Sequence, residues 1–225
     1  MNNSYFQSAA AVRAQIGEYT LFDNIYVYIK DPLPGHIDFH KILKKVESLI
    51  PRPFLYEVES IFVGQFDDFY KMNVNAFFEN GAIHVTNQQD NSEDMLDDIV
   101  HEIAHAVEIG FPSDIYGNRL IRNEFLGKRK RLYKILSLEG YDINISDFLE
   151  LDFSEEFDNF LYIEVGYPEL RKLASGLFPS PYSITSIREY FAIGFEKIFL
   201  GDMEEIKSCC PFLFRQIADL QKKYK

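Results

Sequence analysis

Residues 91–112 read NSEDMLDDIVHEIAHAVEIGFP, and this stretch decides the fold. It opens with cap residues and acids, which favour the start of a helix, and it closes with Gly110 and Pro112, which favour its end. Apolar residues lie almost all round the predicted helix, so we expect it to be buried. Polar side chains inside such a helix need partners, because an unpaired buried polar group is unfavourable.

The middle of this helix carries His101, Glu102 and His105 in the pattern H-E-x-x-H. Residues four apart lie on the same face of a helix, so both imidazoles leave the same side. Two such imidazoles hold zinc at about 2.0–2.1 Å per nitrogen. The Glu beside them can take a proton from the water that zinc activates. The pattern therefore predicts one Zn²⁺ per chain, with His101 and His105 as ligands and Glu102 as the catalytic base.

Catalytic zinc needs a third protein ligand and one open position, and two acids are candidates. Glu124 follows the second His by nineteen residues, a spacing similar to that of thermolysin-like enzymes and zinc aminopeptidases. The residues after Glu124 differ from theirs, which favours an exposed acid on a charged helix. Glu189 lies one helical turn before the small residue Ala192, which leaves room for close approach to the metal helix.

The segment around Glu189 carries a resemblance to a known family. Residues 188–196, REYFAIGFE, resemble the E-[FY]-F-A-E-x-F signature of the anthrax lethal factor catalytic domain and the Pro-Pro endopeptidases. Residues 105–108, HAVE, resemble the H-A-[VIL]-D of that family, and residues 207–220 resemble its closing segment.

This resemblance implies a zincin-like fold of the gluzincin type, with Glu189 as the third zinc ligand. It also implies that Tyr182, seven residues before Glu189, stabilises the oxyanion. Glu108 either orients a ligand imidazole or is a surface acid at the helix end. Ile193 stands where the family has Glu, and residues 111–179 match nothing in it. The 84 positions from His105 to Glu189 exceed the spacing expected for the family, which implies an insertion.

The rest of the chain predicts an α+β fold in one catalytic domain covering residues 1–225. A first lobe of about 1–110 holds a small sheet and the metal helix, and a second lobe of about 111–225 is mostly helical, with the metal in a cleft. The strand Ala82-Ile83-His84-Val85 is expected to be an edge strand that holds an extended peptide by backbone pairing. Periodicity predicts strands at 24–30, 55–64 and 82–85, and helices at 38–50, 91–110, 113–137, 168–176, 184–200 and 203–223.

Composition narrows the class of partner. The net charge of −12 disfavours nucleic acids and anionic membrane surfaces, which require basic patches. We expect the basic run at 128–131 to be a solvated helix face. The only cysteines, Cys209 and Cys210, are adjacent, and adjacent cysteines rarely pair with each other, which favours a reducing compartment. No signal peptide or membrane span is expected, so we predict a cytoplasmic protein or part of a larger viral or toxin assembly.

The predicted function is a zinc metalloendopeptidase acting on a peptide or protein substrate. Three alternatives stay open at this point. The first is a thermolysin-like or aminopeptidase-type zinc enzyme with Glu124 as ligand. The second is a zincin fold kept as a binding or structural module, against which the retained Glu102 argues, and the third is a metal-free protein. The sequence does not predict the oligomeric state, the substrate or the cleavage motif.

Overall fold

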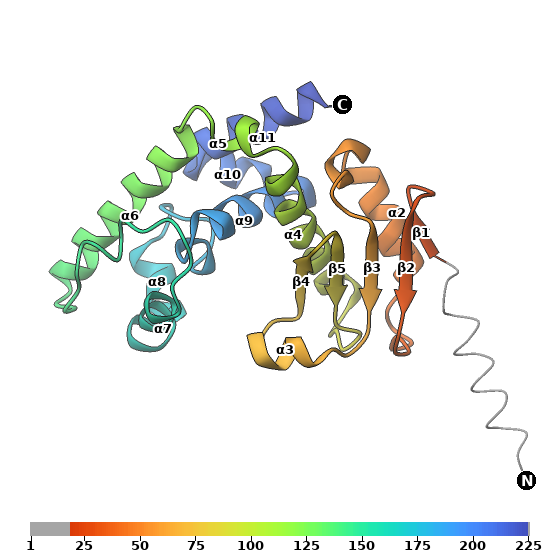
Figure 1. The fold of residues 1–225 in the computed structure, drawn as a ribbon. Coiled ribbons are helices and arrows are strands. Elements are labelled where there is room, and N and C mark those ends of the chain that lie inside the picture. The colour runs from red at the N-terminus through yellow and green to blue at the C-terminus, as the bar shows by residue number, and fades with distance from the viewer. Residues whose placement is uncertain (1–18, 225) are drawn as a thin grey trace, which may run out of the picture. The chain divides into compact units, whose positions relative to one another are not determined.

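The computed structural model describes residues 19–224. Residues 1–18, where no signal peptide is predicted, lie outside this range. The chain divides into two compact units, Met1–Gly110 and Phe111–Lys225. The class is α+β, with one small mixed sheet and mostly helices elsewhere (Figure 1). None of the helices within residues 19–224 is long and apolar enough to cross a bilayer.

The first unit is built on a five-stranded sheet in the order β1-β2-β3-β5-β4 (Figure 1). The three central strands are parallel, and the two outer strands pair antiparallel with their neighbours. Parallel neighbours need crossover connections, which the helices between them supply. The strands are β1 (Tyr19–Leu21), β2 (Ile25–Ile29), β3 (Ser60–Val63), β4 (Ala76–Glu79) and β5 (Ala82–Val85).

Side chains alternate across this sheet, as the period of two requires. In β2, Ile25, Val27 and Ile29 are buried, whereas Tyr26 and Tyr28 are exposed. The buried face packs against helices α2 (Phe39–Leu49) and α4 (Ser92–Gly110), which also contact each other. The other face carries a row of stacked rings that crosses the sheet through Tyr28, Phe62, His84 and Phe77.

The prediction that residues 82–85 form an edge strand is wrong. β5 lies between β3, its parallel neighbour, and β4, its antiparallel neighbour, so its backbone groups are already paired on both sides. The reason is a hairpin: Asn80 and Gly81 adopt positive φ angles of 50° and 80°, as a two-residue turn requires, and fold β4 back onto β5. Within residues 19–224, the two edge strands of this sheet are therefore β1 and β4. Helix α4 contacts β4 and its neighbour β5.

Two further elements of this unit differ from the sequence prediction, and local sequence features explain both. The predicted strand 55–64 starts only at Ser60, because Pro51 and Pro53 favour a 3₁₀ turn over Arg52–Leu55. The short helix α3 (Asp67–Met72), which the sequence did not predict, begins with two acids and ends at Asn73 in the left-handed conformation. The predictions for 24–30, 38–50 and 91–110 are confirmed by β2, α2 and α4.

The second unit is helical, and two of its predicted helices are broken. The prediction for 113–137 fails at Arg119, whose φ of 60° separates α5 from α6. The prediction for 203–223 fails at Pro211, which starts α11 because it lacks the N–H that would continue α10. The helices are α5 (Pro112–Tyr116), α6 (Leu120–Leu138), α7 (Glu155–Asn159), α8 (Tyr167–Leu173), α9 (Ile187–Leu200), α10 (Met203–Cys209) and α11 (Pro211–Lys223), with a π-helical turn at Phe160–Gly166 and a 3₁₀ turn at Tyr182–Ile184.

Helix α9 is held close to α11 by a glycine. A Cβ added at Gly194 would lie 2.3 Å from Cδ2 of Leu213, which is fully buried. Only glycine permits this approach of the two backbones. Tyr190, Phe191 and Phe195 of α9 are also fully buried, so the helix that carries Glu189 is fixed on its apolar sides.

Candidate metal centre

Helix α4 presents both histidines of the H-E-x-x-H pattern. The rings of His101 and His105 have centroids 5.0 Å apart and lie nearly perpendicular, at 79°. The helix is fixed at its start by Asn91, whose Oδ1 accepts a hydrogen bond of 2.8 Å from the Asp94 N–H. Its remaining faces are packed, and Met95, Ile99, Val100, Ile103, Ala104, Ala106 and Val107 are all fully buried.

The two acids of this helix segment are buried as well. Glu102 is 6% exposed and Glu108 is 8% exposed. One carboxylate oxygen of Glu108 lies 3.8 Å from Nδ1 of His105. Glu108 is therefore not a surface acid at the helix end, and its carboxylate lies on the Nδ1 side of the second imidazole.

Glu189 lies in the first turn of α9. Ser186 caps this helix, and its hydroxyl accepts a hydrogen bond of 3.1 Å from the backbone N–H of Glu189. The motif Ser-x-x-Glu is the sequence signature of a capped helix start. The cap fixes the backbone of Glu189, whose side chain is half-buried.

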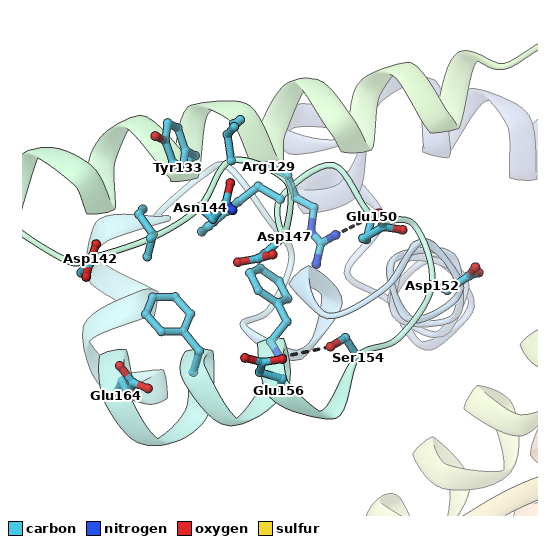
Figure 2. A pocket seen from close by; sticks show the side chains of 15 residues that line it. Arg129, Tyr133, Asp142, Asn144, Asp147, Glu150, Asp152, Ser154, Glu156 and Glu164 are labelled. Carbon is cyan, nitrogen blue, oxygen red and sulfur yellow. Dashed lines mark hydrogen bonds between the residues drawn. The ribbon is translucent and has the colours of Figure 1, made fainter.

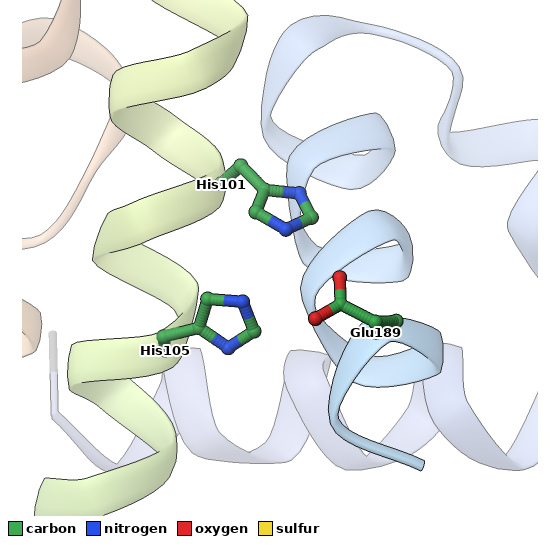
Figure 3. A group of neighbouring side chains, drawn as sticks. All are labelled: His101, His105 and Glu189. Carbon is green, nitrogen blue, oxygen red and sulfur yellow. The ribbon is translucent and has the colours of Figure 1, made fainter. Parts of the chain in front are cut away.

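His101, His105 and Glu189 form a group that could hold a metal ion. One candidate ligand atom from each residue lies within 4.8 Å of the others. Figure 3 shows the two imidazoles on α4 and the carboxylate on α9. No other such group of His, Cys, Asp or Glu occurs within residues 19–224.

Glu124 is not in this group, and it is not a free surface acid either. One of its carboxylate oxygens accepts hydrogen bonds from the Tyr190 hydroxyl (2.9 Å) and the Leu213 N–H (3.1 Å). The other oxygen accepts from the Phe212 N–H at 3.1 Å. Glu124 therefore holds the first turn of α11, where free N–H groups favour an anion.

Tyr182 starts the 3₁₀ turn directly before α9, and its side chain is half-buried. A second phenol, Tyr167, donates a hydrogen bond of 3.4 Å to Asp158. Burial raises the pKa of Tyr167, as do the nearby charges of Asp158 and Glu189. Burial and the charge of Glu189 also raise the pKa of Asp158. The sequence did not identify either residue as a neighbour of Glu189.

Arg129 of α6 fixes the segment between Tyr182 and Glu189. Its guanidinium donates to the carbonyl oxygens of Ile184 (2.9 Å), Thr185 (3.2 Å) and Glu150. It also lies 4.3 Å from the ring centroid of Phe157. The side chain is fully buried, and burial lowers its pKa to about 10, so it stays charged at neutral pH.

The expectation that residues 128–131 form a solvated face is thus wrong for half of the run. Lys128 is 7% exposed and Arg129 is fully buried, whereas Lys130 and Arg131 are exposed. Helical spacing contained the signal, because both buried residues fall on the stripe of buried apolar positions Ile121, Phe125, Leu132 and Leu136. The prediction was wrong because it was based on the charge of the run and not on the position of each residue around the helix.

Arg129 also lines a cavity of about 510 Å³ in the second unit, where its guanidinium points to Glu150 (Figure 2). Phe148 and Phe157 supply apolar walls. His101, His105 and Glu189 do not line it. The acids around it are exposed, and they are Asp142, Asp147, Glu150, Asp152, Glu156 and Glu164.

No protein-family model matches the chain, and the searches of curated proteins and of solved structures find no match either.

We expect Arg129→Met to lower the free energy of unfolding by about 3 kcal/mol or more. The substitution removes the donors to three main-chain carbonyls, and each unsatisfied buried acceptor costs about 1–3 kcal/mol. Arg131→Met changes an exposed residue two positions further on the same helix and is the matched control, with an expected change within about 0.5 kcal/mol. Urea unfolding followed by circular dichroism measures both. Equal stability of the two variants would contradict the anchoring role of Arg129.

Proposed function

We propose that the protein is a zinc-dependent endopeptidase with a zincin-like fold. The observation that carries the proposal is the pair of imidazoles on one face of a packed helix, with a buried Glu between them and Glu189 in the same group of candidate ligands. The resemblance of residues 188–196 and 105–108 to the lethal factor and Pro-Pro endopeptidase family supports the same reading.

The donor set fits zinc and does not suit the hard cations calcium and magnesium. Two imidazole nitrogens and one carboxylate oxygen are the ligands of many catalytic zinc sites, which keep a fourth position open. Calcium and magnesium prefer oxygen ligands throughout. When bound, zinc supplies a Lewis acid and lowers the pKa of a water toward about 7.

Glu102 is the proposed general base. Its carboxylate takes the proton of the attacking water and later delivers it to the leaving amine. Glu102 is buried, so bulk water is largely excluded from around the proposed base. A purely structural zinc site would be closed by four protein ligands and would need no such acid.

Glu108 and Tyr182 are proposed to assist in different ways. The Glu108 carboxylate, 3.8 Å from Nδ1 of His105, would orient that ring so that Nε2 is the nitrogen available to the metal. The Tyr182 hydroxyl would donate a hydrogen bond to the oxyanion of the tetrahedral intermediate. The Tyr167 hydroxyl, already engaged with Asp158, is not assigned this role.

We expect one zinc per chain in protein purified without chelators and supplied with Zn²⁺. Glu189→Gln should weaken zinc affinity by more than about 100-fold, since even the outer partners of a ligand contribute about 10–100-fold. Glu124→Gln is the matched control: it alters an acid that holds α11 and should leave the affinity unchanged. Elemental analysis and competition with a chromogenic chelator measure both.

Two outcomes would contradict this ligand set. One is a chain that takes up no zinc after Zn²⁺ is added. The other is a Glu124→Gln variant that loses zinc while Glu189→Gln keeps it, which would favour the thermolysin-like alternative.

We expect Glu102→Gln to keep its zinc and to lose activity by about 10²–10⁴-fold, the usual contribution of a general base. The assay is digestion of a proteome-derived peptide library by the zinc-loaded protein, with new termini read by mass spectrometry. Cleavage by the variant at the wild-type rate would remove Glu102 from the mechanism. Zinc binding without any cleavage by wild type would favour a binding module in a larger assembly.

We expect Tyr182→Phe to lower kcat by about 10²–10³-fold with little change in KM, because an oxyanion donor acts mainly in the transition state. Tyr167→Phe also removes a phenol hydroxyl from the same unit and is the matched control, with a kcat close to wild type. Kinetics on a peptide from the library separate the two. A larger loss in Tyr167→Phe than in Tyr182→Phe would reverse the assignment.

A further inference from the structure

Lys128 is a buried cation that the proposed peptidase mechanism does not use. Its side chain is 7% exposed, and its ammonium donates to the carbonyl oxygens of Leu177 and Cys209. The ring centroids of Phe178 and Tyr190 lie 5.7 and 5.9 Å from it. Lys128 is in none of the ion pairs found within residues 19–224, although buried charges usually require a partner of opposite sign.

This ammonium binds the backbone carbonyl of Cys209, and its charge acts on two thiols, those of Cys209 and Cys210. Cys209 is the last residue of α10 and is half-buried, and Cys210 is fully buried before α11 begins. Their sulfur atoms are 3.1 Å apart. The hydrogen bond between the two thiols lowers the pKa of Cys209, and the charge of Lys128 lowers it further against the effect of burial. The same hydrogen bond and burial raise the pKa of Cys210.

The surroundings hold this pair in place. Tyr190 packs beside Cys210 and donates to Glu124, which also binds the Phe212 and Leu213 N–H groups. Pro211 fixes the backbone directly after Cys210. The partly exposed thiol beside a cation and the protonated thiol behind it have different chemical roles, since the thiolate is the nucleophile.

We propose that Cys209 and Cys210 form a redox-active dithiol that reacts with small disulfides such as glutathione disulfide. Cys209, as the thiolate whose counter-ion is Lys128, attacks one sulfur of the external disulfide. A Cys209 mixed disulfide forms, and one thiolate leaves. Cys210 then loses its proton and attacks Sγ of Cys209, which forms the Cys209–Cys210 bond and releases the second thiolate. The two cysteines lose two electrons and two protons, and the external disulfide is reduced to two thiols.

The adjacency of the cysteines makes the product reversible. Cα atoms of neighbouring residues are about 3.8 Å apart, below the roughly 4.4–6.8 Å usual for a disulfide. A strained disulfide has a higher reduction potential and is reduced readily. The pair is thus suited to a labile oxidised state, whereas the sequence alone favours two unpaired thiols.

The test uses the full chain without added metal and glutathione disulfide as the probe, followed by intact-mass spectrometry. Wild type is expected to lose two hydrogen atoms with no lasting adduct. Cys210→Ser should keep one glutathionyl group, because the resolving thiol is gone. Cys209→Ser should react more slowly by about tenfold or more, since one pKa unit changes the thiolate fraction tenfold. Equal rates in the two serine variants, or a wild type that ends as a glutathionyl adduct, would overturn the proposal.

The role of Lys128 is tested with dipyridyl disulfide, a probe that carries no charge near neutral pH. Lys128→Met should slow the reaction of Cys209 by about tenfold, whereas Lys130→Met removes an exposed lysine from the same helix and should not. An unchanged rate in a folded Lys128→Met variant would remove Lys128 as the counter-ion. Lys128→Arg keeps the positive charge and should retain most of the rate; a loss equal to that of Lys128→Met would also contradict the electrostatic role.

Discussion

Arg129 fixes the backbone on which the candidate metal centre depends in the second unit. Its guanidinium binds carbonyls at Ile184 and Thr185, directly before α9, and a third carbonyl at Glu150 in a different segment. Segments without regular structure cannot satisfy their own carbonyls, so a buried multidentate donor replaces the missing ladder of hydrogen bonds. Lysine could not do the same, because its single ammonium lacks the planar fork. The cap by Ser186 then begins α9 and sets the backbone of Glu189.

The sequence predicted the metal helix well because several independent signals agree there. Cap residues, apolar periodicity and a terminal Gly all predict the same helix, which the structure has at Ser92–Gly110. Sequence spacing alone does not decide between Glu189 and Glu124 as the third zinc ligand, since Glu124 also has a plausible spacing from His105. The two acids differ in their tertiary surroundings. Glu124 accepts hydrogen bonds from backbone N–H groups of α11, whereas Glu189 lies in the group with the two histidines.

Other features depend on strand pairing, on local breaks or on partners far away in sequence, and apolar periodicity alone does not predict them. The edge position was assigned to β5, but strand order follows from pairing, and the tight turn at Asn80-Gly81 places β4 outside it. The breaks at Arg119 and Pro211 are local, yet apolar periodicity continues through them and masks them. The burial of Arg129 follows from carbonyls that are more than twenty residues away along the chain.

The polar residues of α6 follow a simple electrostatic rule. Glu124 faces N–H groups at the start of α11, where the helix has its positive end. One turn later, Lys128 faces the carbonyl of Cys209 at the end of α10, where a helix has its negative end. Arg129 faces carbonyls as well. The sign of each buried side chain thus matches the backbone groups it meets. The same rule explains why the Lys128 ammonium meets the carbonyls of Leu177 and Cys209, and its charge then acts on the thiol of Cys209 at the end of α10.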